Sequence, residues 1–202
     1  LLAPIFIWRL WGHYSLMAHW LILGSLNIYF ARNFKYKNWI IIFFFSYLTS
    51  AYIAVMMFIV FVTDLFKRIT AKEINLIKVF KLSLIFICVS FLSLYIIGYI
   101  EPGTKLSTSG FGIYKANLAT FFDSNDLWSN IFSDIKSVEG EHEGFAFLGS
   151  GIIFLLITTI FISFYKKKSI NLNKILGLKY ILIISILLFI LALSNNIHLS
   201  NL

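Results

Sequence analysis

The sequence predicts an all-α fold, a polytopic transmembrane helix bundle of about five spans with one long extracytoplasmic loop. Of the 202 residues, 59% are hydrophobic and only 13% are charged, and the mean hydropathy is +0.87. An average soluble domain is about 45–50% apolar and about 25% charged, so this chain has more apolar surface than a water-soluble protein of its size can hide. Uncharged runs that approach the ~20 residues needed to cross a bilayer recur along it. We therefore expect the bilayer to be its solvent.

The predicted spans are the runs that lack a formal charge, because each helical residue advances about 1.5 Å through a hydrocarbon core of about 30 Å. They are residues 14–31, 38–63, 82–100, 145–165 and 180–197. The first contains His19, and the last loses its apolar character after Leu193. The chain is therefore divided into a first group of three helices in 1–100, a loop at 101–144, and two helices in 145–202.

The charges of the connections predict the orientation. The connection 64–81 holds five basic and two acidic residues, and 166–179 holds five lysines and no acid. Both are expected in the cytoplasm by the positive-inside rule. The connection 101–144 contains seven of the nine acidic residues, and it is expected in the periplasm of a bacterium, with the spans in the inner membrane.

The basic segment 32–37 disagrees with this topology. If residues 38–63 form one span that ends in the cytoplasm, Arg32, Lys35 and Lys37 lie outside, which the positive-inside rule disfavours for a short loop. Either the first hairpin inserts against the rule, or the segment around His19 does not cross. A third interpretation is that Lys35 and Lys37 bind an anionic partner.

The densest polar cluster lies immediately before the fourth predicted span. Glu141, His142 and Glu143 follow Glu139, so three carboxylates and an imidazole lie at a predicted membrane surface. Such groups would suit a divalent cation, since hard oxygen ligands prefer Mg²⁺, Mn²⁺ or Ca²⁺, or they would supply a general base. A purely structural interpretation is equally open, because acidic side chains are favoured in the first turn of any helix.

The remaining features of the sequence mainly exclude classes of function. The single Cys88 excludes an internal disulfide framework and a cysteine metal cluster. The excess of 17 basic over 9 acidic residues falls in predicted loops, so it orients a membrane protein and does not indicate nucleic acid as a partner. Phosphate loops, zinc motifs and nucleophile elbows are absent. His19, as an ionisable residue within a span, is a candidate functional residue, although a packed and hydrogen-bonded histidine is the commoner case.

Several stretches together resemble a known group of proteins. They are "LMAHWLILGSLNIYF" at 16–30, "SYLTSAYIAVMM" at 46–57, "GFGIYKANLATFFD" at 110–123, "EGEHEGFAFLGSG" at 139–151 and "LALSNNI" at 191–197. In this order the chain resembles a bacterial multi-spanning membrane family of unknown function, which is similar in organisation to GT-C-type glycosyltransferases. The segment from Glu143 to Gly149 carries the resemblance most strongly.

The resemblance implies a fragment of a transferase that takes a polyprenyl-phosphate-linked sugar at the periplasmic face. Glu141, His142 and Glu143 would then be catalytic, with a divalent cation as the cofactor to consider, and Lys105, Lys115 and His19 would bind substrate. The acidic motif that such enzymes use in their first outer loop would lie upstream of Leu1. The alternatives are a surface-polysaccharide ligase or polymerase, and a non-enzymatic membrane scaffold subunit; the sequence assigns no oligomeric state.

Overall fold

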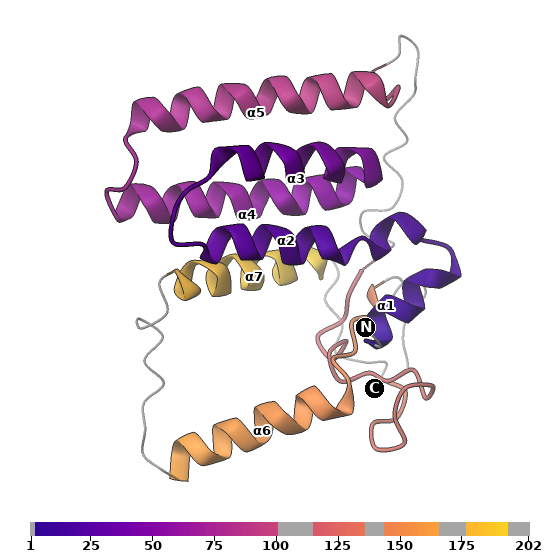
Figure 1. Cartoon of the computed structure of the whole chain (residues 1–202). Helices are drawn as coiled ribbons and strands as arrows, with labels where there is room; N and C mark the ends of the chain where they lie inside the picture. The colour runs from indigo at the N-terminus through magenta and orange to yellow at the C-terminus, as the bar shows by residue number, and fades with distance from the viewer. Residues whose placement is uncertain (1–2, 101–114, 136–143, 166–176, 194–202) are drawn as a thin grey trace. The chain divides into compact units, whose positions relative to one another are not determined.

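A computed structural model describes residues 3–100, 115–135, 144–165 and 177–193, and within these ranges the chain is helical with turns and contains no β-strand (Figure 1). The chain divides into two compact units. We call 12–106 together with 175–184 the bundle unit, and 1–11, 107–174 and 185–202 the loop unit. The helix α7 (Leu178–Ala192) contributes its first residues to the bundle unit and its last to the loop unit.

The bundle unit is built from four helices that run side by side (Figure 1). They are α2 (His19–Phe30), α3 (Tyr36–Thr49), α4 (Ala51–Thr70) and α5 (Leu76–Ile96). The helix α3 packs against the other three. Small buried residues, Ser25, Ser46 and Ser93, allow neighbouring helices to approach closely. Their hydroxyls can be buried because each donates to a carbonyl of its own helix.

Aromatic rings form the core of this unit. Phe43 of α3 lies with its ring centroid 4.9 Å from that of Phe86 of α5, and Phe61 of α4 lies 3.9 Å from Phe86. Trp39 contacts Phe61 at 5.3 Å. All four side chains are almost completely buried, so these rings connect three helices in one cluster whose pairs gain energy beyond their buried area.

The structure corrects the prediction of one continuous helix over 38–63. The helix α3 ends at Thr49, Ser50 is fully extended with φ −165° and ψ 133°, and α4 begins at Ala51. The two helices fold back on each other as an antiparallel hairpin, in which Phe43 contacts both Phe58 and Phe61. Such stacking is impossible within one straight helix, and the hydroxyl of Thr49, which bonds the carbonyl of Phe45, helps to close α3.

The other predicted helix bounds shift by several residues. The helix α5 begins at Leu76 rather than at 82, because the Asn75 side chain accepts the Lys78 N–H and caps it. A 3₁₀ turn (Tyr14–Met17) precedes α2, so the predicted 14–31 is not one helix. The helix α6 (Ser150–Tyr165) starts after Gly149, which has φ +88°, rather than at 145. The described part of the predicted 180–197 belongs to α7, whose last helical residue is Ala192.

The loop unit has a small aromatic core of its own. It contains α1 (Pro4–Trp8), a 3₁₀ turn (Arg9–Trp11), the turns of 115–135 and α6. Phe145, Phe147 and Ile153 are buried and pack against partly buried neighbours, which are Trp8, Trp128, Phe132 and Leu148. Within the described ranges the segment 115–135 is a sequence of hydrogen-bonded turns without a helix.

Among the described helices, α5 alone is both long and apolar enough to cross a membrane, with 21 residues and a mean hydropathy of 2.2. The helices α6 and α7 are apolar but shorter. The all-helical class is therefore confirmed for the described residues, and the number of about five spans stays a prediction.

Candidate functional site

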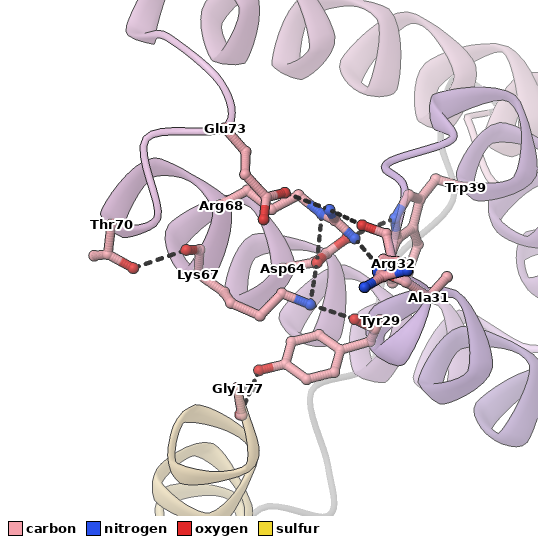
Figure 2. A network of polar contacts seen from close by, with 10 residues as sticks. All are labelled: Tyr29, Ala31, Arg32, Trp39, Asp64, Lys67, Arg68, Thr70, Glu73 and Gly177. Carbon is pink, nitrogen blue, oxygen red and sulfur yellow. Dashed lines mark hydrogen bonds and ion pairs between the residues drawn. The ribbon is translucent and has the colours of Figure 1, made fainter. Parts of the chain in front are cut away.

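The most developed polar feature of the described residues is a network at one end of the bundle unit (Figure 2). Its ion-paired side chains come from the last turns of α4 and from Glu73, which follows that helix. Thr70 is the last residue of α4, and the other members lie at the end of α2, in the connection to α3, at the start of α3 and before α7. They are Tyr29, Ala31, Arg32, Trp39, Asp64, Lys67, Arg68, Thr70, Glu73 and Gly177. We call this set the clamp.

Asp64 is the centre of the clamp and is completely buried. Its Oδ1 lies 2.8 Å from the Lys67 ammonium and 3.0 Å from Nε of Arg68, and its Oδ2 accepts the Trp39 Nε1–H at 3.1 Å. The spacing i, i+3 and i+4 places all three charged groups on one face of α4. The carboxylate is therefore the counter-charge of the buried Lys67, and it shares the buried Arg68 with Glu73.

The two cations connect α4 to other elements. Arg68 donates to the Ala31 carbonyl at 2.9 Å and the Arg32 carbonyl at 3.4 Å, and it pairs with Glu73 at 2.6 Å. Lys67 donates to the carbonyl of Tyr29, with its ammonium 3.8 Å from the centroid of the Tyr29 ring. The guanidinium of Arg68 thus connects the C-terminal end of α4 to the α2–α3 connection and to the segment that follows α4.

Tyr29 extends the clamp to the residue before α7. Its hydroxyl donates to the Gly177 carbonyl at 2.6 Å. Gly177 has φ +84°, and a Cβ there would lie 2.5 Å from the Lys67 side chain and 2.7 Å from the Tyr29 hydroxyl. Glycine is therefore required at this position both by its backbone conformation and by the close approach of two side chains.

The clamp has a structural role, because its donors are occupied by protein acceptors and its central carboxylate is buried. Two cations face two carboxylates, and each side-chain nitrogen of Lys67 and Arg68 already has a protein acceptor. A catalytic acid or base needs a proton that a substrate can reach, and Asp64, with no exposed surface, offers none. We conclude that the clamp fixes the connections at this end of the bundle unit.

Open depressions lie around the same helices, and three of them are lined entirely by described residues. One, of about 340 Å³, lies at the α2–α3 connection and is lined by Asn27, Ile28, Ala31, Arg32, Asn33, Lys35 and Asn38. A second, of about 650 Å³, lies between α4 and α5 and is lined by Ile69, Lys72, Glu73, Ile74, Asn75, Leu76 and Lys78. A third, of about 310 Å³, lies near the Ser50 turn and is lined by Tyr47, Val55, Phe58, Phe86, Ile87, Ser90, Phe91 and Leu94. The first two are polar and cationic, whereas the third is apolar.

The residues singled out by the sequence are only partly described. Lys105, Glu141, His142 and Glu143 lie outside the described residues. Lys115, in the loop unit, is 6% exposed. His19, in the bundle unit, is partly buried and is the first residue of α2, rather than a residue inside a span. Within the described ranges no three His, Cys, Asp or Glu side chains are grouped as metal ligands.

The motif around Gly144 has a structural explanation in the described part. A Cβ on Gly144 would collide with the backbone of Lys115 and Ala116, so only glycine fits. Phe145 and Phe147, which follow it, are core residues. The helix α6 begins at Ser150. Glu141 and Glu143 lie outside the described residues, so neither the functional nor the helix-dipole interpretation of these two acids is tested.

The acids of 115–135 stabilise turns. Asp123 accepts the N–H of Asn125 at 3.0 Å and that of Ile135 at 3.3 Å, and Asp126 accepts the N–H of Asp134 at 2.7 Å. Such bonds from Asp side chains to nearby backbone N–H groups are common in turns. Burial, followed by the nearby charges of Asp123 and Asp126, raises the pKa of Asp134 above its ordinary value.

The clamp itself was not predicted, although part of its signal is visible in the sequence. The charge pattern predicts a cytoplasmic connection over 64–81, whereas α4 continues to Thr70. An Asp followed at i+3 and i+4 by Lys and Arg, within a run that includes Leu65 and Phe66, is typical of a helix whose charges face one side. Trp39 and Gly177, which complete the arrangement, are distant in sequence and have no such signal.

Comparison with known proteins gives a family and no activity. Neither a curated protein nor a solved structure matches the chain. One family, described as a domain of unknown function (DUF6311), matches residues 1–202. That match provides no link to GT-C-type glycosyltransferases, while it agrees with the expected family of unknown function. Because the match spans the whole chain, the protein belongs to the DUF6311 family.

Proposed function

We propose that the chain is part of an integral membrane glycosyltransferase-like protein that takes a polyprenyl-phosphate-linked sugar at the periplasmic face. One observation carries the proposal: the two ends of the bundle unit differ in chemistry. Basic side chains and the clamp gather at one end, and the apolar groove of about 310 Å³ lies near the Ser50 turn at the other. A lipid-linked substrate needs both a membrane orientation and an apolar surface for its chain.

The orientation is supported by the α3–α4 hairpin. Because the chain turns back at Ser50, the segment 32–37 lies at the same end as the last turn of α4, where Arg68 bonds Ala31 and Arg32. Gly177 is bonded at this end as well. The segment 32–37, the end of α4 and Gly177 are therefore neighbours, and the positive-inside rule assigns this end to the cytoplasm without the conflict that one long helix creates. The groove then belongs to the periplasmic half.

The groove has the composition expected for an isoprenoid chain. Aromatic and branched aliphatic side chains of α3, α4 and α5 line it, and Ser90 and Tyr47 provide its hydroxyls. Within a bilayer, lipid tails are as apolar as the protein, so affinity for such a chain comes from packing. Its volume lies at the lower end of small-molecule sites, which suits a segment of a long chain.

Lys115 supports a phosphate-binding role in the loop unit. Lys115 is 6% exposed, so most of its side chain is covered by protein. A bound phosphate would supply a counter-charge for this largely covered lysine. Lys115 together with Lys105 would neutralise the leaving phosphate, while Glu141, His142 or Glu143 would activate the acceptor or hold a divalent cation.

The groove is tested by cross-linking the full-length protein in bilayers to a photoreactive polyprenyl phosphate. We expect labelled peptides from the groove-lining parts of α4 and α5, and Ser90→Trp, which fills the groove, should reduce the labelling. Leu92→Trp is the matched control, because Leu92 is exposed on α5 and does not line the groove. Equal labelling of both variants would contradict the assignment of the groove.

The chemistry and topology need their own tests. Glycan transfer by the full-length protein should fall when Glu141 and Glu143 are replaced by Ala, and unchanged transfer would remove both from the site. With Cys88 replaced by Ser, cysteines placed in 101–144 should react with impermeant reagents from the periplasm. Reaction from the cytosol alone would leave the proposed transfer without a place to occur.

A further inference from the structure

We propose that the depression at the α2–α3 connection, which we call the corner pocket, is a binding site for a phosphate group. It has a volume of about 340 Å³, and its polar lining consists of Asn27, Arg32, Asn33, Lys35 and Asn38. A guanidinium, an ammonium and three carboxamides supply many N–H donors, and phosphate oxygens accept from all of them. This site shares no residue with the groove and does not include Lys115, and it has no part in the proposed glycosyl transfer.

The charge of the corner pocket favours an anion. Its lining includes two cations and no carboxylate. The neighbouring pocket between α4 and α5 also has two cations, Lys72 and Lys78, but Glu73 lines it as well and is paired with Arg68. The two pockets thus differ by one carboxylate at the same end of the unit, and we assign the anion to the one that lacks it.

The clamp organises the backbone under the corner pocket. Arg68 holds the carbonyls of Ala31 and Arg32, while the carbonyl of Lys35 accepts the N–H of Asn38 at 3.1 Å. These carbonyls are therefore occupied by protein donors. The side chains of Arg32 and Lys35 stay exposed and do not take part in the clamp, so they are free of its structural role.

Two sources of phosphate share this chemistry, a lipid headgroup and a soluble phosphate. The orientation proposed above places the pocket at the cytoplasmic surface, where basic pockets between helices bind anionic headgroups and where each basic side chain contributes about 1 kcal/mol. A lipid headgroup is therefore the favoured source. This choice of source rests on the proposed orientation, whereas the phosphate site does not.

The lipid source is tested with the full-length protein in nanodiscs that contain equal amounts of phosphatidylglycerol and phosphatidylcholine. Native mass spectrometry measures which lipid stays bound. We expect the wild-type protein to retain phosphatidylglycerol preferentially. Arg32→Gln with Lys35→Gln should lower this preference by about fivefold per charge removed. The matched control, Lys72→Gln with Lys78→Gln, removes the same charge beside Glu73 and should leave most of the preference.

The soluble source is tested in detergent, by calorimetric titration of the same variants with inorganic phosphate at constant ionic strength. Binding that Arg32→Gln with Lys35→Gln abolishes, with lipid retention unchanged, supports the site and assigns it to soluble phosphate. If neither lipid nor phosphate distinguishes this variant from the control, the proposal is overturned. Arg32→Lys with Lys35→Arg keeps both charges and should bind, which separates loss of charge from loss of fold. Failure of the polyprenyl cross-linking would not affect this measurement.

Discussion

Replacing Asp64 with Asn removes the charge at the centre of the clamp and preserves the shape of the side chain. The amide oxygen can still accept the Trp39 N–H, which now lies 3.1 Å from the carboxylate. The ammonium of Lys67 and the guanidinium of Arg68, at 2.8 and 3.0 Å, lose their common counter-charge. The substitution therefore isolates the ionic part of the clamp from its packing.

The size of the effect follows from these distances and from burial. At an effective dielectric constant of about 20, each attraction across about 3 Å is worth roughly 6 kcal/mol before desolvation is subtracted. Arg68 retains Glu73 at 2.6 Å, but Lys67 retains only the Tyr29 carbonyl and ring. Removing one partner of a buried pair typically costs about 3–5 kcal/mol. We expect Asp64→Asn to lower the free energy of unfolding by that amount.

The assay is the loss of helical circular dichroism as sodium dodecyl sulfate is added to the full-length protein in mixed micelles. Thiol-reactive dyes are unsuitable because Cys88 is exposed in the folded protein. Asp64→Asn combined with Lys67→Met should be at least about 1 kcal/mol more stable than Asp64→Asn alone, since no lysine is then left unpaired. Lys37→Gln, an exposed change at the same end, should stay within about 0.5 kcal/mol of wild type. A loss below about 1 kcal/mol for Asp64→Asn would refute the reasoning.

Three further predictions concern single positions. Tyr29→Phe should cost about 1 kcal/mol in the same unfolding assay, because the Gly177 carbonyl loses its donor at 2.6 Å while the ring under Lys67 remains. Gly177→Ala should cost about 2 kcal/mol or more, because the residue has φ +84° and its Cβ would contact two clamp side chains; an unchanged midpoint would contradict this. The raised pKa of Asp134 means that its protonated form stabilises the fold and that this stabilisation is lost as pH rises through the folded-state pKa. Asp134→Asn should therefore slow proteolysis within 115–135 at pH 7 and have no effect at pH 3.

Local patterns in the sequence predicted local structure well. The uncharged runs identified where helices lie, and Asp123 and Asp126 bond backbone N–H groups in turns, as their residue types indicate. Helix ends were less accurate because they depend on single residues. The Asn75 cap extends α5 toward its N-terminus, and Gly149, with positive φ, precedes the start of α6.

Long-range contacts account for what the sequence did not predict. Nothing local forces the chain to turn at Ser50, since the run 38–63 is uncharged throughout, contains no proline or glycine and is long enough for one helix. The turn is stabilised by Phe43 against Phe61 and by Trp39 bonded to Asp64, pairs that are separated by 18 and 25 residues. Here tertiary packing overrides the intrinsic helix propensity of the run.

The conflict in the charge pattern nevertheless contained the information needed to find the turn. A single helix over 38–63 places the cations of 32–37 on the side opposite to those of 64–81, against the positive-inside rule. A reversal inside that run removes the conflict and places Arg32 beside Arg68, which is the contact observed. The positive-inside rule concerns the orientation of basic loops, whereas the aromatic contacts concern helix packing. Both indicate a reversal at Ser50, and they do so for independent physical reasons. A violated charge rule across a long apolar run is therefore a reason to look for a hairpin within it before a span is removed from the count.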